Sequence, residues 1–81
     1  MKVDRESMKK WVAEAIAELG GKGRVVEICK EVWEKHGDEI SASGDMFYKW
    51  QYEIRWSADS LRKEGVLRSA DESADGMWEL A

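Results

Sequence analysis

Apolar residues recur along the first part of the chain with the spacing of an amphipathic helix. Between residues 4 and 19 they lie three or four positions apart, which places their side chains on one helical face. Asp4 stands at the position of an N-cap, and Gly20 and Gly21 follow the last apolar residue, where glycine readily adopts the left-handed conformation that ends a helix. The pattern predicts a first helix over residues 4–19 with a buried face made of Met8, Trp11, Val12, Ala15, Ile16 and Leu19.

The same spacing resumes after a short link at residues 22–24. It predicts a second helix over residues 25–36, because His36 in the last turn and Gly37 after it form a stop signal. Residues 38–45 contain turn-forming types without a convincing helical period and are predicted to form a loop with room for one helical turn. The buried face of this helix is predicted to comprise Val25, Ile28, Cys29, Val32 and Trp33.

A longer helix is predicted over residues 45–64, with Asp45 as its N-cap and Gly65 after its end. Its apolar residues advance in steps of three and four, so at about 100° per residue they stay within a narrow arc. We expect this arc to pack against the first two helices. It consists of Phe47, Trp50, Ile54, Ala58 and Leu61.

The remaining residues have the pattern of two short strands. Residues 66–68 and 77–80 are apolar or mixed, and the polar stretch 69–76 between them contains turn formers. They predict a β-hairpin that follows three helices. This order is that of an α+β winged helix-turn-helix, in which the hairpin is the wing, and we expect one such domain over residues 1–81.

Composition agrees with a small folded domain. The chain has 81 residues, of which 43% are hydrophobic, and its 13 cationic and 17 acidic side chains give a net charge of −4. A single cysteine cannot form an internal disulfide, which favours a reducing compartment. Neither a signal-peptide core nor an apolar stretch of membrane-spanning length is present in the sequence. We therefore expect a cytoplasmic location.

The chemistry-bearing residues do not form a catalytic pattern. Cys29 and His36 are the only residues of their types, so the sequence has neither a zinc tetrad nor a Cys-His nucleophile pair. Cys29 is predicted to be a small core residue, and His36 a helix-terminal or solvated cation. The glycines at 20–23 lack P-loop spacing. We expect no enzymatic activity, no cofactor, no metal and no small-molecule substrate.

The face of the third helix opposite its apolar arc combines aromatic and cationic residues. Such a face is typical of the recognition helix of a helix-turn-helix protein, whose side chains read base edges while neighbouring cations position the phosphates. Trp56 belongs to this face or packs beneath the hairpin or the loop 38–45, and the sequence leaves these alternatives open. The predicted base contacts are Tyr48, Lys49, Gln51, Tyr52 and Arg55, and the predicted backbone contacts are Lys22, Arg24, Arg62 and Lys63.

Several motifs, in this order, resemble the N-terminal winged-helix domain of Mrr-type restriction endonucleases. They are the segments 17–21, 26–28, 54–56, 61–67 and 76–80. The most specific parts are Arg55-Trp56 followed by the pattern of Leu61, Gly65 and Leu67, and the closing pattern of Gly76, Trp78 and Leu80. The resemblance implies a restriction-modification module that binds duplex DNA, including modified DNA, without cutting it, since the nuclease half of that family has no counterpart in these residues.

Charge supports an alternative function. The presumed wing tip carries Asp71, Glu72 and Asp75, which a phosphate backbone would repel, and the chain as a whole is acidic. Exposed tryptophan and tyrosine are also common anchors of protein interfaces. The alternative is a winged-helix module that binds a protein partner or a second copy of itself, and no nucleic acid.

Overall fold

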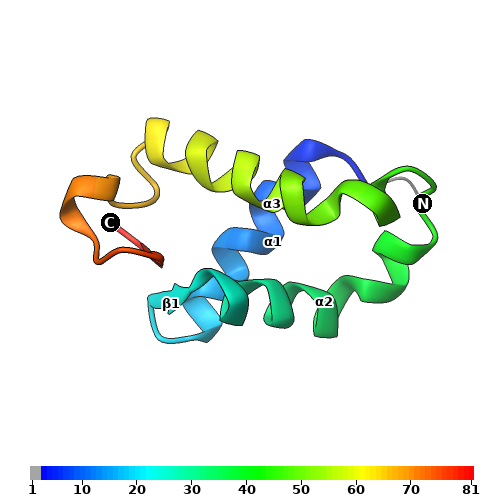
Figure 1. Ribbon diagram of the computed structural model, residues 1–81, viewed down its shortest axis with the longest axis horizontal. Coiled ribbons are helices and arrows are strands. Elements are labelled where there is room, and N and C mark those ends of the chain that lie inside the picture. Colours follow the sequence, from blue (N-terminus) through cyan, green and yellow to red (C-terminus); the bar gives the residue numbers. More distant parts are fainter. Residues whose placement is uncertain (1–2) are drawn as a thin grey trace.

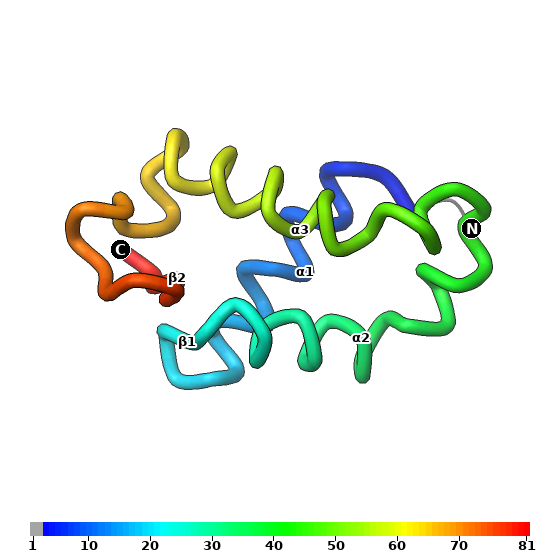
Figure 2. The backbone as a smooth tube through the Cα atoms, in the orientation of Figure 1, coloured from blue at the N-terminus to red at the C-terminus, as the bar shows by residue number. Residues whose placement is uncertain are grey.

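The computed structural model describes residues 3–81, which form three α-helices and a two-stranded antiparallel sheet (Figure 1). Helices α2 and α3 lie side by side and run in opposite directions, with α1 packed behind them (Figure 2). The sheet lies at one end of the long axis. The elements are α1 (Arg5–Glu18), β1 (Lys22–Arg24), α2 (Val25–Ser41), α3 (Met46–Lys63), a 3₁₀ turn η1 (Ala70–Glu72) and β2 (Met77–Glu79).

Helix α1 forms where its apolar period predicted it. The carboxylate of Asp4 accepts a 2.9 Å hydrogen bond from the backbone N–H of Ser7 and so caps the helix as expected. Gly20 and Gly21 follow with φ of 93° and 101°, conformations that favour glycine. The prediction for Leu19 was wrong, because its side chain lies beyond the helix and is 36% exposed.

Helix α2 does not end at Gly37, as the sequence predicted, but continues through it to Ser41. Contacts on both sides of the glycine explain this continuation. The ring of His36 stacks on Trp11 of α1 with 3.9 Å between centroids, and Ile40 is fully buried in the core. His36 is therefore a packed residue in the helix interior rather than a solvated cation at its end, and the loop is shortened to residues 42–45.

Helix α3 buries most of the arc predicted for it. Ile54, Ala58 and Leu61 are in the core and Trp50 is partly buried against it. Phe47 is not a core residue: it is 42% exposed and its ring packs at the surface. Two polar residues, Glu53 and Ser57, are buried on the side of α3 next to this arc.

The predicted hairpin is only partly formed, and β2 pairs mainly with β1, a segment that the sequence analysis treated as a link. The register aligns Gly23 with Trp78. Gly23 is buried there, and a Cβ atom would lie 2.8 Å from the end of the exposed Leu19 side chain, which would have to move aside. Residues 66–68 add a single bridge, Leu67 to Leu80, with the Arg68 N–H donating to Glu79 at 2.8 Å. β1, β2 and residues 66–68 are thus three neighbouring antiparallel segments.

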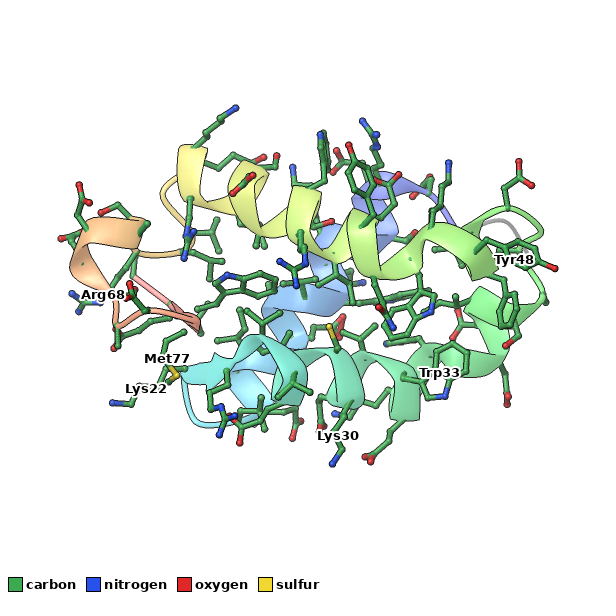
Figure 3. The ribbon with its side chains drawn as sticks, viewed as in Figure 1. Lys22, Lys30, Trp33, Tyr48, Arg68 and Met77 are labelled. Carbon is green, nitrogen blue, oxygen red and sulfur yellow. The ribbon has the colours of Figure 1, made fainter. Side chains whose placement is uncertain are left out.

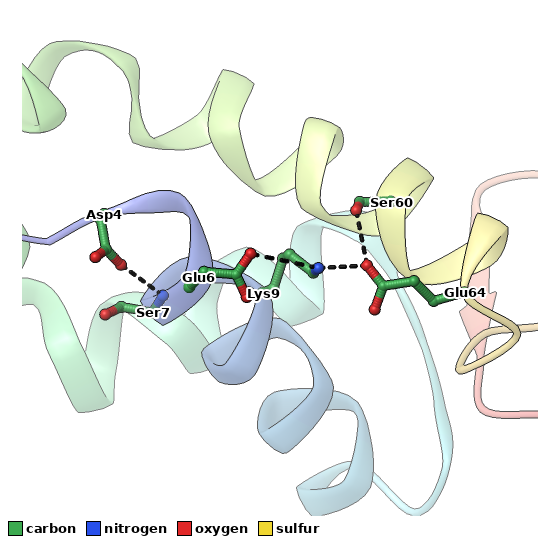
Figure 4. A network of polar contacts seen from close by, with 6 residues as sticks. All are labelled: Asp4, Glu6, Ser7, Lys9, Ser60 and Glu64. Atoms are coloured by element: carbon green, nitrogen blue, oxygen red, sulfur yellow. Dashed lines mark hydrogen bonds and ion pairs between the residues drawn. The ribbon is translucent and has the colours of Figure 1, made fainter.

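Polar side chains tie α1 to the end of α3 (Figure 4). The ammonium of Lys9 donates to the carboxylate of Glu64 and lies 3.7 Å from that of Glu6, while Ser60 donates to Glu64 at 3.1 Å. The hydrogen bond from Lys9 lowers the pKa of Glu64, and the same bond raises the pKa of Lys9. These contacts join α1 to the C-terminal end of α3 at the surface.

The core is continuous from the helices to the sheet. Trp78 of β2 and Leu67 form the end of the core next to the sheet, and both are buried. In the part of the chain that the structure describes, no helix is long and apolar enough to cross a membrane.

Candidate nucleic-acid interface

The exposed side of α3 presents one straight stripe of side chains along successive helical turns. Tyr48 and Tyr52 are 83% and 64% exposed, unusually high fractions for aromatic residues. Arg55, Asp59 and Lys63 continue the stripe and are also exposed. At about 100° per residue these five positions fall within an arc of about 80°. Four of the predicted contact residues are therefore brought together, with one acid among them.

Lys49 and Gln51 flank this stripe on its two sides. Both are exposed, so the structure leaves all five predicted base contacts accessible from solvent. Gln51 and Arg55 also border the space between α3 and α2. They lie at the edge of the stripe, whereas Tyr52 and Lys63 face away from α2.

Trp56 is neither a free contact residue nor packed beneath the hairpin. Its ring is half-buried, and the guanidinium of Arg5 lies 4.2 Å from the ring centroid. The same guanidinium donates to the buried carboxylate of Glu53 at 3.0 Å. The start of α1 therefore covers one face of this indole, a contact between distant residues that sequence spacing does not indicate.

The four predicted backbone contacts are distributed over different parts of the molecule. Arg62 is half-buried and directs its Nη2 at the carbonyl of Met77, 3.5 Å away, so it joins α3 to β2. Lys22 and Arg24 are exposed on β1. Figure 3 places Lys22 and Tyr48 at opposite ends of the long axis, which measures 35 Å. Of the four, Lys63 alone belongs to the stripe.

The loop between residues 68 and 77 is acidic in the structure as in the sequence. It contains η1, where Glu72 accepts a hydrogen bond from the Ser69 hydroxyl at 3.1 Å. Asp71 and Asp75 are exposed. This loop has the position of the predicted wing, and its charge opposes close contact with phosphates.

A groove separates the open sides of α2 and α3. It consists of two hollows of about 360 and 310 Å³ that share Val26, Cys29 and Gln51. Trp33 of α2 and Trp50 of α3 stack across it with 5.1 Å between ring centroids. Burial raises the pKa of the Cys29 thiol, so this side chain is a poorly reactive part of the groove wall.

The groove was not predicted, because the apolar periods placed Trp33 and Phe47 in the core, whereas both are exposed. Their rings lie 6.5 Å apart at the surface, and Phe47 meets Tyr48 edge-on at 5.0 Å. The sequence did contain one signal for the groove. Val26 lies seven residues before Trp33, so both are on one face of the helix, and this face holds more apolar residues than a core stripe needs.

Among residues 3–81, no three His, Cys, Asp or Glu side chains gather closely enough to hold a metal ion. Comparison with known proteins finds no matching family model, no similar curated protein and no similar solved structure. The resemblance to the Mrr-type domain therefore depends on the motifs quoted above.

Proposed function

We propose that this chain is a winged-helix module that binds duplex DNA by inserting α3 into the major groove. The observation that carries the proposal is the stripe on α3. Its exposed tyrosines and cations are spaced so that one helical face would meet the groove along four turns. An α-helix fits the width of the major groove, where base edges carry a distinguishable pattern of donors and acceptors.

The sheet supports the winged-helix part of the proposal. Such a fold requires two antiparallel segments after the third helix. Residues 66–68 run antiparallel to β2 and are hydrogen-bonded to it. Strand β1 adds a third segment beside β2 and anchors it to the helices. The loop between residues 68 and 77 is then the wing.

Local charge favours DNA at α3 although the chain is acidic. Lys49, Arg55 and Lys63 outnumber Asp59 on the stripe and its flank, whereas the acids of the wing lie elsewhere. With Lys49 and Lys63 at phosphates, log affinity should fall against log salt with a slope of about −2. In this proposal α3 provides the affinity and the acidic wing stays away from the backbone.

Base readout would come from the side of the stripe nearest α2. An arginine pairs with the two acceptors of guanine, and a glutamine pairs with the acceptor and donor of adenine. Arg55 and Gln51 are one turn apart there, so they can reach neighbouring base pairs. The tyrosines would contact sugars and thymine methyl groups.

The test is fluorescence polarisation with mixed-sequence duplex DNA, unmodified and adenine-methylated, at low and at physiological salt. Arg55→Ala should weaken binding about 5- to 150-fold, the range that one bidentate base contact provides. Lys63→Ala should weaken it less and make the salt slope shallower by about 1. Lys10→Ala, which removes an exposed charge from α1, is the matched control. Absence of binding at low salt, or a flat salt profile, would refute the proposal.

A further inference from the structure

A straight row of side chains runs along the edge of the stripe on the side away from α2. Lys49, Trp56 and Lys63 are seven residues apart, so at about 100° per residue they fall within an arc of about 40°. Neighbours in this row are about 10 Å apart along the helix axis. Lys49 and Lys63 are exposed cations, whereas the middle position is an indole. The side chains of α3 alone therefore leave the middle of the row without a charge.

Arg5 of α1 places a cation at this middle position. The start of α1 lies beside α3 (Figure 1), and the guanidinium of Arg5 is 4.2 Å from the centroid of the Trp56 ring. Its Nε donates to the carboxylate of Glu53 at 3.0 Å, one turn after Lys49 on α3. The ring contact and the hydrogen bond together hold the guanidinium over Trp56. Lys49, Arg5 and Lys63 thus form a row of three cations from two helices, which we call the cationic row.

The guanidinium of Arg5 keeps donors for a further partner. An arginine side chain has five N–H groups, and the bond to Glu53 uses the one on Nε. Within residues 3–81 the Arg5 side chain makes no other hydrogen bond, and it is 49% exposed, whereas the side chain of Glu53 is 3% exposed. Solvent therefore meets the cation of this pair and not the carboxylate. The two Nη groups are free to donate to an anion outside the molecule.

The acids nearest to Arg5 have partners of their own or lie on another side. Asp4 caps α1 by accepting a hydrogen bond from the backbone there. Glu6 lies 3.7 Å from the ammonium of Lys9. Asp59 of the stripe lies about 60° around α3 from Trp56, on the side away from α1. The cationic row itself contains no acid.

We propose that Arg5 is a phosphate contact and that the cationic row follows one strand of a DNA duplex. This role rests on the proposed function: with the stripe in the major groove, the row lies beside the backbone at one edge, while Gln51 and Arg55 lie on the opposite side of the stripe. Arginine suits the position, because its planar guanidinium stacks on an aromatic ring and pairs with a phosphate through two parallel hydrogen bonds. The start of α1 then contributes to DNA binding together with α3.

The salt dependence of DNA binding tests this role. Lys49 and Lys63 alone predict a slope of about −2 in log affinity against log salt, and a third phosphate contact at Arg5 makes it about −3. Because Arg5→Ala alone would leave the buried carboxylate of Glu53 without its cation, the variants are compared in the Glu53→Met chain. Circular dichroism checks that each variant is folded.

In the Glu53→Met chain, Arg5→Ala should weaken binding to every duplex by the same factor and make the slope shallower by about 1. The affinity lost should then be about four times larger at 50 mM than at 200 mM salt. Lys10→Ala in the same chain is the matched control, because Lys10 is an exposed cation about 140° around α1 from Arg5 and should leave the slope unchanged.

Equal slopes for the Arg5→Ala and Lys10→Ala variants would overturn the role of Arg5, since a purely structural role does not change the number of phosphates contacted. Arg55→Ala, measured beside them, distinguishes this failure from that of the proposed function. If Arg55→Ala weakens binding and Arg5→Ala leaves the slope unchanged, only the role of Arg5 is refuted. If the unmodified chain does not bind DNA at low salt, the proposed function is refuted together with it.

Discussion

Replacing Arg5 by alanine should destabilise the fold more than any other change of a surface charge. The side chain of Glu53 is only 3% exposed, whereas that of Arg5 is 49% exposed and covers Trp56 as it donates to the carboxylate. The second oxygen of Glu53 and the hydroxyl of Ser57 are buried without a hydrogen-bond partner among the described residues. Arg5→Ala would therefore leave a buried carboxylate without its cation.

Removing one partner of a fully buried pair costs about 3–5 kcal/mol. Because Arg5 is half solvated, solvent screening reduces this to about 1.5–3 kcal/mol. Loss of the contact with the Trp56 ring adds about 0.5–1 kcal/mol. The expected decrease in the free energy of unfolding is therefore about 2–4 kcal/mol, which urea denaturation followed by circular dichroism resolves well in a domain of this size.

A double-mutant cycle separates the ion pair from the general effect of shortening Arg5. Glu53→Met removes the buried charge and keeps an apolar side chain of similar length, so it should cost less than Arg5→Ala. In the Glu53→Met background, Arg5→Ala should lose only the ring contact, about 0.5–1 kcal/mol. Lys10→Ala is the control and should stay within about 0.5 kcal/mol of the parent chain. Equal costs of Arg5→Ala in both backgrounds would refute the reasoning.

Three further predictions concern the supports of the fold and groove. Lys9 lowers the pKa of Glu64 below its ordinary value of 4.5, so the pair stabilises the fold above that pH, and its contribution is lost as the pH falls through the lowered pKa. Lys9→Met should therefore flatten the acid side of a profile of stability against pH. An unchanged profile would contradict this. Gly23→Ala should change the free energy of unfolding by no more than about 1 kcal/mol, because only the end of the exposed Leu19 side chain has to move, and a larger loss in thermal denaturation would contradict this. Gly37→Ala should displace the Trp33 ring and alter tryptophan fluorescence with little loss of stability; an unaltered spectrum would show that the glycine does not seat the ring.

The helices were predictable because their signals are local. Asp4, the apolar period of α1 and the glycines after it all lie within one segment and agree with one another. The end of α2 was not predictable from such signals. Gly37 is a stop residue by local preference, but the stack of His36 on Trp11 and the burial of Ile40 outweigh that preference, and both depend on the tertiary fold.

Strand β1 illustrates a second limit. It has only three residues, Lys22–Arg24, and its pattern is too short to distinguish a strand from a link. Its conformation depends on pairing with β2, more than fifty residues away, and on the space that Gly23 leaves opposite Trp78. Contacts of this separation do not appear in the local sequence.

The candidate contact surface was predictable in part. The helical period places Tyr48, Tyr52 and Lys63 on one arc, and the structure exposes them there. The period does not reveal that Arg62 turns toward the sheet or that Arg5 covers Trp56. The spacing of residues along a helix identifies the helical face on which each one lies. Whether that face is covered depends on the neighbouring elements of the fold.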